Sequence, residues 1–455
     1  MKPNHAKRMT DHVLAQLVCL GTHTVTGLLA VCGRQFQDWS ADYRMYERER
    51  VVPEHLFEPV RQWLCDNQDG PVVTAMDDTG LRRAGRKVYG AKYMRDPMGP
   101  PFRVNLMWAQ RFVQTSMACK SPCGQATMIP VDWVHAPMPA KPKANAGEEA
   151  WKQYGEEREK ASLSAVGAQR IRHLRQWLDE HGARQRQLWT VVDGSFTNST
   201  VLKNLPENTV LVGRIRADAK LYHLPEQQPS RGRRCSYGVQ APTPEQLRSD
   251  DAAPWQTVSV YYGGKRRKLR VKKLAPLRSR TAGEHQTLQL LVIAPTKYRL
   301  SKNSKVLYRK PAYIICTDPD APIKQVVQHY LWRWDIEVNH RDEKTLLGVG
   351  EAQVRTPQAV QNQTGCAVAA YAMLLTAAAK CRKEGHDCNH LPLPKWRKRK
   401  PQRITTMTLI NNVRYELWAR SIHFSGFMTN NRQNVKPEKT IYSPKSALFY
   451  ANRYS

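Results

Sequence analysis

Four residues of the segment 330–344 carry side chains that could act together on a phosphate ester. They stand at offsets of zero, three, seven and fourteen and are Tyr330, Arg333, Glu337 and Lys344. On one continuous α-helix these offsets fall within an arc of about 60°. A carboxylate flanked by cations can hold a divalent metal ion while the cations bind phosphate oxygens. The spacing therefore predicts metal-assisted cleavage of nucleic acid, with an ordinary solvated helix face as the alternative.

Two apolar, strand-like runs end in aspartate and then break at a glycine. The first run, PVVTAM, is followed by Asp77 and Asp78, and the second, QLWTVV, is followed by Asp193. Acidic side chains at strand ends are accessible to a ligand. Together with Glu337 they can converge on two divalent ions that activate a water or a 3′-hydroxyl and stabilise the leaving oxygen. We therefore expect Asp193, Glu337 and one of the two neighbouring aspartates to form a two-metal site.

The elements that must position these acids follow one another in a definite order. A strand meander is followed by a helix that ends near residue 182, a strand that ends at Asp193 and a late helix that carries Glu337. This is the order of a ribonuclease-H-like α/β core. Between residues 210 and 318 the chain is strand-rich and basic, which predicts an inserted β subdomain.

The composition indicates a folded protein with a polyanionic partner. The chain has 455 residues, of which 41% are hydrophobic, and this suffices for a packed core in about two to four units. Its 71 Lys and Arg residues outnumber the 39 acidic residues, which gives a formal net charge of +32. Nucleic acid satisfies such a charge through phosphate contacts and counterion release.

The sequence favours a cytoplasmic protein with no membrane partner. The longest apolar run, 367–379, is shorter than the roughly 20 residues of a membrane span and predicts a buried helix. The N-terminal segment has no small-residue cleavage site after its apolar part.

The ten cysteines are scattered and often lie in apolar segments, as expected of thiols in a reducing compartment. One group is close enough in sequence to suggest a metal site: Cys381, His386, Cys388 and His390. Its spacing matches no standard zinc module, so zinc binding stays open.

These residues resemble those of a known family, the DDE transposases of bacterial insertion sequences, in the subgroup marked by Tyr-x2-Arg-x3-Glu-x6-Lys. The signature is matched without a gap by Tyr330, Arg333, Glu337 and Lys344. Trp334 directly after the arginine, the β-rich insertion and the DDTG motif that begins at Asp77 are also similar to that subgroup. The resemblance covers roughly residues 70 to 350.

The resemblance implies a catalytic and metal-binding role for three acids. Asp193 is then the second metal ligand and Glu337 the third. For the first ligand, the Asp-x-Ser/Thr pattern of the family favours Asp77, with Asp78 as the alternative first acid. Two Mg²⁺ ions are the implied cofactors, and Mn²⁺ is expected to substitute for them.

The resemblance also implies DNA contacts near the cut. Tyr330, Arg333 and Lys344 are the implied phosphate contacts. Trp334 could stack on a base flipped out of the duplex, and packing of its ring against the core is the alternative. The implied partners are double-stranded DNA, as element ends and as target, and a second copy of the chain in a homodimeric synaptic complex. The implied location is the prokaryotic cytoplasm, in association with the nucleoid.

The expected organisation is a ribonuclease-H-like catalytic core with an inserted β-rich subdomain, an N-terminal helical domain and a helical, basic C-terminal region. The predicted boundaries are 1–66 for the N-terminal DNA-binding domain, 67–209 and 311–350 for the two parts of the core, 210–310 for the insertion and 351–455 for the C-terminal region. Within the insertion, seven cations are expected to follow a DNA backbone, and a two-faced strand with a solvated basic side is the alternative. They are Lys265, Arg266, Arg267, Lys268, Arg270, Lys272 and Lys273.

These features together predict a cut-and-paste DNA transposase. Such an enzyme binds terminal inverted repeats, nicks the strands with the help of Mg²⁺ and joins the freed 3′ ends to target DNA. Two alternative hypotheses remain. The protein could be a catalytically silent, transposase-derived DNA-binding regulator, or a ribonuclease-H-like nuclease without strand transfer.

Overall fold

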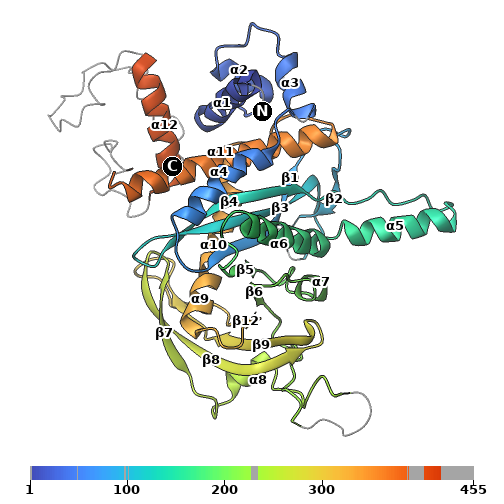
Figure 1. Ribbon diagram of the computed structural model, residues 1–455, viewed down its shortest axis with the longest axis vertical. Helices are drawn as coiled ribbons and strands as arrows, with labels where there is room; N and C mark the ends of the chain where they lie inside the picture. The colour runs from blue at the N-terminus through green and yellow to red at the C-terminus, as the bar shows by residue number, and fades with distance from the viewer. Residues whose placement is uncertain are drawn as a thin grey trace. The chain divides into compact units, whose positions relative to one another are not determined.

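The computed structural model describes residues 3–48, 50–96, 99–100, 102–226, 234–386, 388 and 404–421. The chain forms two compact units, whose elements are labelled in Figure 1. The first unit comprises Met1–Val60, Arg82–Tyr89 and His340–Ser455, and the second comprises Arg61–Leu81 and Gly90–Asn339. The N-terminal and C-terminal regions, expected to be separate domains, therefore belong to one unit.

A mixed sheet of ten strands forms the centre of the second unit. In chain order its strands are β1 (Val72–Arg82), β2 (Lys92–Arg95), β3 (Leu106–Lys120), β4 (Ala126–His135), β5 (Leu188–Val192), β6 (Thr209–Arg214), β7 (Gln256–Tyr262), β8 (Lys265–Ser279), β9 (Gly283–Ile293) and β12 (Ala312–Cys316). They lie in the order β2, β3, β1, β5, β6, β12, β9, β8 and β7, and β4 pairs with β3. A second, two-stranded sheet joins β10 (Lys297–Tyr298) to β11 (Leu307–Tyr308). The fold class is thus α/β, as predicted.

The middle of the main sheet is parallel and buried. β5 pairs in parallel with β1 on one side and with β6 on the other. All of β5 is buried, and its run of apolar and β-branched residues is typical of a strand covered on both faces. Because the strands are parallel, the paired parts of β1 and β5 end at the same edge of the sheet.

The strands of the predicted insertion do not form a large sheet of their own. β12 pairs antiparallel with both β6 and β9, and β9, β8 and β7 then continue the main sheet as an antiparallel meander. Only β10 and β11 form a separate sheet among the described residues. The boundary predicted at residue 210 also falls inside β6, a strand of the parallel part.

Several helices of the second unit lie around this sheet. They are α5 (Glu148–Lys160), α6 (Leu163–Glu180), α7 (Ser199–Leu202), α8 (Pro244–Ser249), α9 (Ile323–Trp332) and the start of α10 (Trp334–Thr345). Ser162 caps α6 by accepting a hydrogen bond from the Ala165 N–H at 3.2 Å. A Cβ atom on Gly167 of α6 would lie 2.8 Å from the Phe196 ring and 3.0 Å from Met76 Cε. Glycine therefore lets α6 approach the strand ends that carry the predicted acids.

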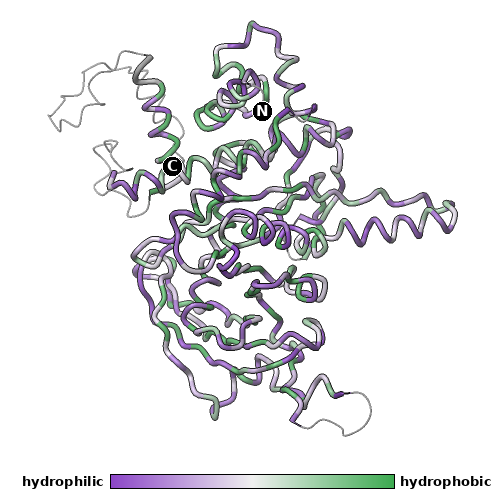
Figure 2. The backbone as a smooth tube through the Cα atoms, viewed as in Figure 1, coloured by the Kyte–Doolittle hydropathy of each residue, from purple (hydrophilic) through white to green (hydrophobic). Residues whose placement is uncertain are grey.

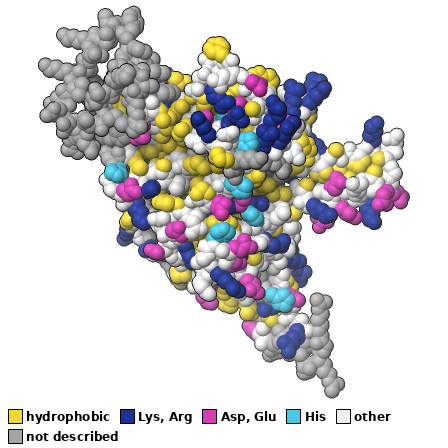
Figure 3. Space-filling model, turned by 45° about the horizontal axis from the view of Figure 1, so that its top comes forward, with side chains coloured by type: hydrophobic (Ala, Val, Ile, Leu, Met, Phe, Trp, Pro, Cys, Tyr) yellow, Lys and Arg dark blue, Asp and Glu magenta, His cyan; other side chains and the backbone are white. Residues whose placement is uncertain are grey.

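Helix α5 extends away from the sheet of its unit and buries none of its residues (Figure 1). It is hydrophilic along most of its length (Figure 2), and it exposes side chains of both charge signs (Figure 3). Acidic residues in its first turn and basic residues in its last turn complement the helix dipole.

The first unit is helical. Its helices are α1 (Pro3–Val18), α2 (Val25–Val31), α3 (Ser40–Glu47), most of α4 (Pro53–Asp66), α11 (Pro357–Lys383) and α12 (Thr406–Ser421). The Asn362 amide of α11 donates to the Tyr46 carbonyl of α3 at 2.8 Å. α11 is long and apolar enough to cross a membrane, but 72% of its apolar window is buried inside the protein. The buried core helix of a protein can have the same length and apolar composition, and a buried helix is the prediction for 367–379.

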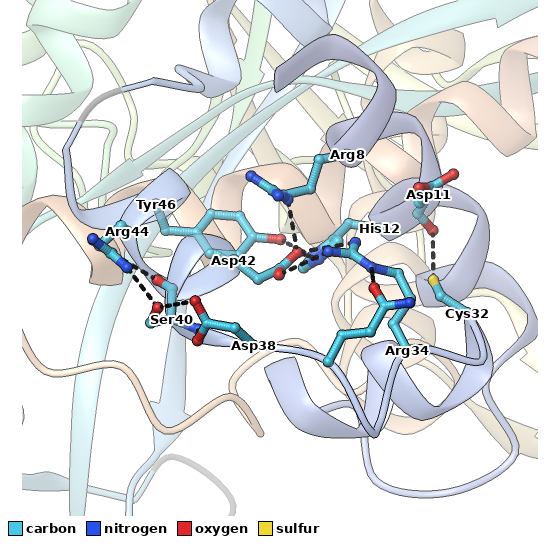
Figure 4. A network of polar contacts seen from close by, with 11 residues as sticks. Arg8, Asp11, His12, Cys32, Arg34, Asp38, Ser40, Asp42, Arg44 and Tyr46 are labelled. Carbon is cyan, nitrogen blue, oxygen red and sulfur yellow. Dashed lines mark hydrogen bonds and ion pairs between the residues drawn. The ribbon is translucent and has the colours of Figure 1, made fainter. Parts of the chain in front are cut away.

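A buried ionic network links α1 to α3 in this unit (Figure 4). Asp42 lies 2.9 Å from His12 Nε2, accepts a hydrogen bond from Arg34 Nη2 at 3.1 Å and pairs with Arg8 Nε at 3.2 Å. His12 Nδ1 lies 2.8 Å from the Tyr46 hydroxyl. Burial works to raise the pKa of Asp42, but the His12 hydrogen bond and the surrounding cations outweigh it and hold the pKa below its ordinary value.

Replacing Asp42 with Asn removes the charge that these cations surround. We expect the free energy of unfolding to fall by about 3 kcal/mol, because a buried ion pair that loses one partner leaves the other charge uncompensated. Denaturant titration followed by circular dichroism measures this change. Asp38 is exposed, and Asp38→Asn is expected to change the stability by less than about 0.5 kcal/mol. If the two variants were equally stable, the network would not hold the helices together.

Candidate active site

Asp77 and Asp193 occupy matching positions beside neighbouring parallel strands. The pairing of β1 with β5 ends with Met76 opposite Val192, and each aspartate is the next residue in its segment. Paired residues of adjacent strands lie about 5 Å apart and point to the same face. After burial, the charge of Asp193 is the strongest influence that raises the pKa of Asp77. The sheet therefore brings these two predicted acids together.

Arg333 connects Asp77 to Glu337. Its Nη1 lies 3.5 Å from Asp77 Oδ2, and its Nη2 lies 3.0 Å from Glu337 Oε1. The side chains of Arg333 and Asp77 are 12% and 16% exposed, and that of Glu337 is 38% exposed. The guanidinium thus links the third predicted acid to Asp77, in a partly buried place.

The surroundings of Asp77 disfavour its charged form. Burial and the charges of Asp193 and Asp78 raise the pKa of Asp77 to about 7, against the attraction of Arg333 and a hydrogen bond from the Asp78 N–H at 2.9 Å. A carboxyl group crowded by like charges is stabilised in its ionised form by a divalent cation.

Asp193 is held by the turn that follows it. Ser195 donates to Asp193 Oδ1 from its backbone N–H at 2.8 Å and from its hydroxyl at 2.6 Å. The Thr197 hydroxyl donates to the Asp193 carbonyl at 2.6 Å. Phe196, between these two residues, is fully buried and anchors the turn in the core. The carboxylate therefore has a defined orientation before any ligand arrives.

The three carboxylates fit a divalent metal by their chemistry. Hard carboxylate oxygens are the ligands that Mg²⁺ prefers, and the repulsion between Asp77 and Asp193 calls for a cation. Within the part of the chain that the structure describes, however, no three His, Cys, Asp or Glu side chains are grouped closely enough to hold an ion. Arg333 is the cation that Asp77 and Glu337 share in this structure.

The segment 330–344 is predicted as one helix, and the structure shows two. α9 ends at Trp332, and α10 begins two residues later. Arg333 between them keeps helical dihedral angles, with φ −50° and ψ −34°. The Trp332 indole donates to the Gly124 carbonyl at 3.2 Å, and the Arg333 guanidinium binds Asp77 and Glu337. These tertiary contacts compete with a regular helix at this point. The pair of Arg333 and Glu337 survives the break, but the stripe of four residues is not the face of one helix.

Two side chains that the sequence did not single out fix these helices on the sheet. Gln328 of α9 accepts from the Tyr261 N–H at 2.7 Å and donates to the Tyr261 carbonyl at 3.1 Å. Asn339 of α10 is buried and donates to the Met128 carbonyl at 2.9 Å and to the Ser116 hydroxyl at 3.2 Å. Local patterns carry no signal for either role, since polar residues on helices are ordinarily solvated.

The other predicted site residues differ in their burial and in their surroundings. Tyr330 is partly buried and packs against the hydrophobic core of its unit. Trp334 is 57% exposed, so the alternative in which its ring packs in the core is wrong. Burial lowers the pKa of Arg111 in β3 and the charge of Asp78 opposes this, which places Asp78 near Arg111. Lys344 lies in the last turn of α10, in the first unit.

The suggested cysteine and histidine group is only partly described. His390 lies outside the described residues. Cys388 is buried with its thiol 3.7 Å from the Ala378 carbonyl, and His386 Nε2 lies 3.8 Å from Glu384 Oε2. Zinc binding by this group stays open.

The raised pKa of Asp77 predicts a pH-dependent effect on stability. The carboxyl group of Asp77 has a pKa of about 7 in the folded protein and of about 3.9 in the unfolded chain. Its contribution to stability is therefore fully present below about pH 3.9 and is lost as the pH rises through 7. In EDTA, Asp77→Asn is therefore expected to be about 2 kcal/mol more stable than wild type at pH 8, and this gain should vanish at pH 4. Urea titrations at the two pH values measure it.

Asp132→Asn serves as the control for this prediction. Asp132 is buried and accepts two hydrogen bonds from Arg170, at 2.6 and 2.7 Å. Its loss should destabilise the protein at both pH values. An Asp77→Asn protein that is less stable than wild type at pH 8 would show that Asp77 is not crowded by like charges.

Comparison with known proteins gives a family for the chain. No curated protein matches the chain. The family model of the DDE superfamily endonucleases matches residues 2–267, which include Asp77 and Asp193 and end before the helix of Glu337. Members of this superfamily are metal-dependent nucleases that act on DNA. Since the match extends over more than half of the sequence, the chain belongs to the DDE superfamily endonucleases.

Proposed function

We propose that this protein is the DNA transposase of a bacterial insertion sequence, which nicks DNA at the element ends and joins the freed 3′ ends to target DNA. The observation that carries the proposal is the meeting of Asp77, Arg333 and Glu337 beside Asp193. Family membership supports the nuclease step. The complete Tyr-x2-Arg-x3-Glu-x6-Lys signature supports the transposase subgroup.

The strand order supports a ribonuclease-H-like core. β3 is the neighbour of both β1 and β4 and runs antiparallel to β4, and β5 and β6 follow β1 in parallel pairing. In this core Asp77 and Asp193 lie at one strand edge, and the helix with Glu337 follows β12. The assignment of residues 1–66 to DNA binding remains part of the proposal.

Asp77, Asp193 and Glu337 would hold the metal. When bound, two Mg²⁺ ions, or Mn²⁺ in their place, supply Lewis-acid activation of the attacking water or 3′-hydroxyl and stabilisation of the leaving oxygen. Asp77 has to lose its proton to act as a ligand, which its pKa of about 7 allows at neutral pH. The Ser195 hydrogen bonds orient Asp193 without consuming both of its oxygens, since both end on Oδ1.

A basic surface on the insertion is proposed to bind the DNA backbone. Between residues 252 and 317 the chain has 15 Lys and Arg residues and one acidic residue, Glu284. Lys265, Arg266 and Lys268 of β8 are exposed. Arg309 lies over the Tyr262 ring at 5.9 Å and over the Tyr298 ring at 5.1 Å, which brings the β10–β11 hairpin beside the β7–β8 hairpin. Such a surface suits phosphate contacts.

Lys272 does not belong to this surface, although it was expected to follow the DNA backbone. It is 1% exposed, and its Nζ donates to the carbonyls of Leu247 at 3.1 Å, Arg248 at 3.2 Å and Asp250 at 2.5 Å. It also lies over the Trp255 ring at 4.7 Å. Lys272 therefore satisfies the carbonyl groups at the end of α8 and has a structural role.

Several further parts of the proposal rest on the family resemblance. Tyr330, Arg333 and Lys344 are proposed to contact DNA phosphates, and the exposed Trp334 is available to stack on an unpaired base. Holding two element ends requires a homodimer in a synaptic complex. The site of action is proposed to be the prokaryotic cytoplasm, with the protein bound to the nucleoid.

Incubating the purified protein with linear DNA that carries the element's own ends, with and without Mg²⁺, tests the proposal. We expect Mg²⁺-dependent nicks at the ends and covalent products with target DNA. A protein that shifts the DNA but never cuts it would instead be a silent regulator. Cleavage without joined products would identify a nuclease that lacks strand transfer.

A further inference from the structure

We propose that Arg333 keeps the metal site closed in the free protein and opens it by moving onto a DNA phosphate. The binding of DNA and of metal would then be coupled through one side chain. This inference rests on the proposed function, because it concerns the same three carboxylates. It adds an order of events, in which DNA binds first and the carboxylates bind the metal second.

The contacts of Arg333 place it where a metal ion would have to be. Its guanidinium reaches Asp77 Oδ2 at 3.5 Å and Glu337 Oε1 at 3.0 Å, so the two acids already share one cation. A divalent ion between the same oxygens would repel a guanidinium at that distance. One cation therefore has to leave before the other can be bound.

Arg333 also carries a donor that the protein does not satisfy. Its Nε atom is buried and has no hydrogen-bond partner among the described residues. The side chain as a whole is 12% exposed. A buried donor without a partner is unfavourable, and a phosphate offers several acceptor oxygens to a guanidinium at once. Exchange of the carboxylates for a phosphate would relieve this deficit.

The backbone around Arg333 allows the side chain to move by itself. Arg333 lies between α9 and α10 and belongs to neither helix. Gln328 fixes α9 to β7, and Asn339 fixes α10 to β3 and β4. Since both helices are anchored, Glu337 can stay near the strand ends while the guanidinium turns away.

The effects of DNA and of metal on each other's binding must be equal, because both depend on the same movement of Arg333. If DNA binding removes Arg333 from the carboxylates and so tightens metal binding, bound metal must tighten DNA binding by the same factor. Couplings of this kind typically amount to about 5-fold to 150-fold in affinity. A free enzyme would then hold metal weakly and remain inactive until DNA is in place.

The test measures Mn²⁺ binding without any catalytic readout. Free Mn²⁺ is followed by electron paramagnetic resonance at pH 7.5 in the absence of DNA, for wild type and Arg333→Gln. We expect Arg333→Gln to bind Mn²⁺ about 10-fold more tightly, because the carboxylates lose their internal cation. Equal or weaker binding by Arg333→Gln would overturn the inference.

Arg170→Gln is the matched control. Arg170 lies in the same unit, is similarly buried at 15% exposure, and also forms an ion pair, with Asp132 at 2.6 Å. Its loss should leave Mn²⁺ affinity unchanged. Should Arg333→Gln fail to fold, Arg333→Lys replaces it, since a lysine cannot bridge both carboxylates and should also tighten Mn²⁺ binding.

Two further arms separate this inference from the proposed function. Adding Glu337→Gln to Arg333→Gln should abolish the gained Mn²⁺ affinity, and if it does not, the carboxylates are not the metal ligands and the proposed function itself is wrong. Adding a short DNA duplex should tighten Mn²⁺ binding by wild type and not by Arg333→Gln. If DNA tightened both proteins equally, the site would bind metal but Arg333 would not couple it to DNA.

Discussion

Replacing Glu337 with Gln, or Asp193 with Asn, is expected to lower the rate of Mg²⁺-dependent DNA nicking by at least about 10³-fold. The metal supplies several kcal/mol of stabilisation to the transition state, and each 1.36 kcal/mol corresponds to a factor of ten in rate. Without metal, neither carboxylate is expected to contribute to DNA affinity, because both are repelled by phosphate. Nicking of labelled duplex in Mg²⁺ and a gel-shift titration in EDTA on the same protein measure the two quantities.

Asp335→Asn is the matched control for these substitutions. Asp335 lies in the first turn of α10, as Glu337 does, but it is not one of the three proposed metal ligands. Its replacement should change the nicking rate by less than about threefold, since it removes no metal ligand. Nicking by Glu337→Gln at the wild-type rate would remove Glu337 from the active site.

Neutralising three cations of the insertion is expected to weaken DNA binding by about 10²-fold at low salt. Lys265, Arg266 and Lys268 are exposed on β8, and each phosphate contact contributes about 0.9 to the slope of log affinity against log salt concentration. In the triple Gln variant, the slope of log affinity against log salt concentration should therefore be smaller in magnitude by about 2.7. Fluorescence anisotropy titrations over a salt series give both numbers.

The exposed helix α5 offers a matched control for that variant. Lys152, Arg158 and Lys160 are also three exposed cations of the same unit, but five glutamates lie on the same helix. Their replacement with Gln should leave the salt slope unchanged within about 0.5. Equal loss of affinity in both triple variants would mean that overall charge, and not the surface of the insertion, determines binding.

The two strand ends were predictable because their signal is local. Runs of apolar residues that stop at Asp77 and at Asp193 predict buried strands with acids at their ends, and the pairing of Met76 with Val192 places the acids side by side. The proximity of Arg333 to Glu337 was also predictable, because residues four apart in helical backbone are neighbours and Arg333 keeps helical dihedral angles.

Features that depend on distant contacts were not predictable from local patterns. The break between α9 and α10 coincides with the bond from Trp332 to Gly124, which lies far away in the sequence. The continuation of the main sheet into the insertion depends on β12 pairing with both β6 and β9. The bridging position of Arg333 depends on Asp77, a residue of another strand, so the sequence suggested a phosphate contact and not an ion pair.

The claim on which the account depends is that Asp77, Asp193 and Glu337 share a metal. With hydrogen peroxide and ascorbate added, Fe²⁺ bound in place of Mg²⁺ reduces peroxide to hydroxyl radicals that cut the nearby polypeptide backbone, and mass spectrometry locates the cuts. With DNA present, we predict cuts near residues 77, 193 and 337 that Mg²⁺ suppresses and that Glu337→Gln abolishes. Iron-dependent cuts that occur elsewhere, or that persist in Glu337→Gln, would contradict the account.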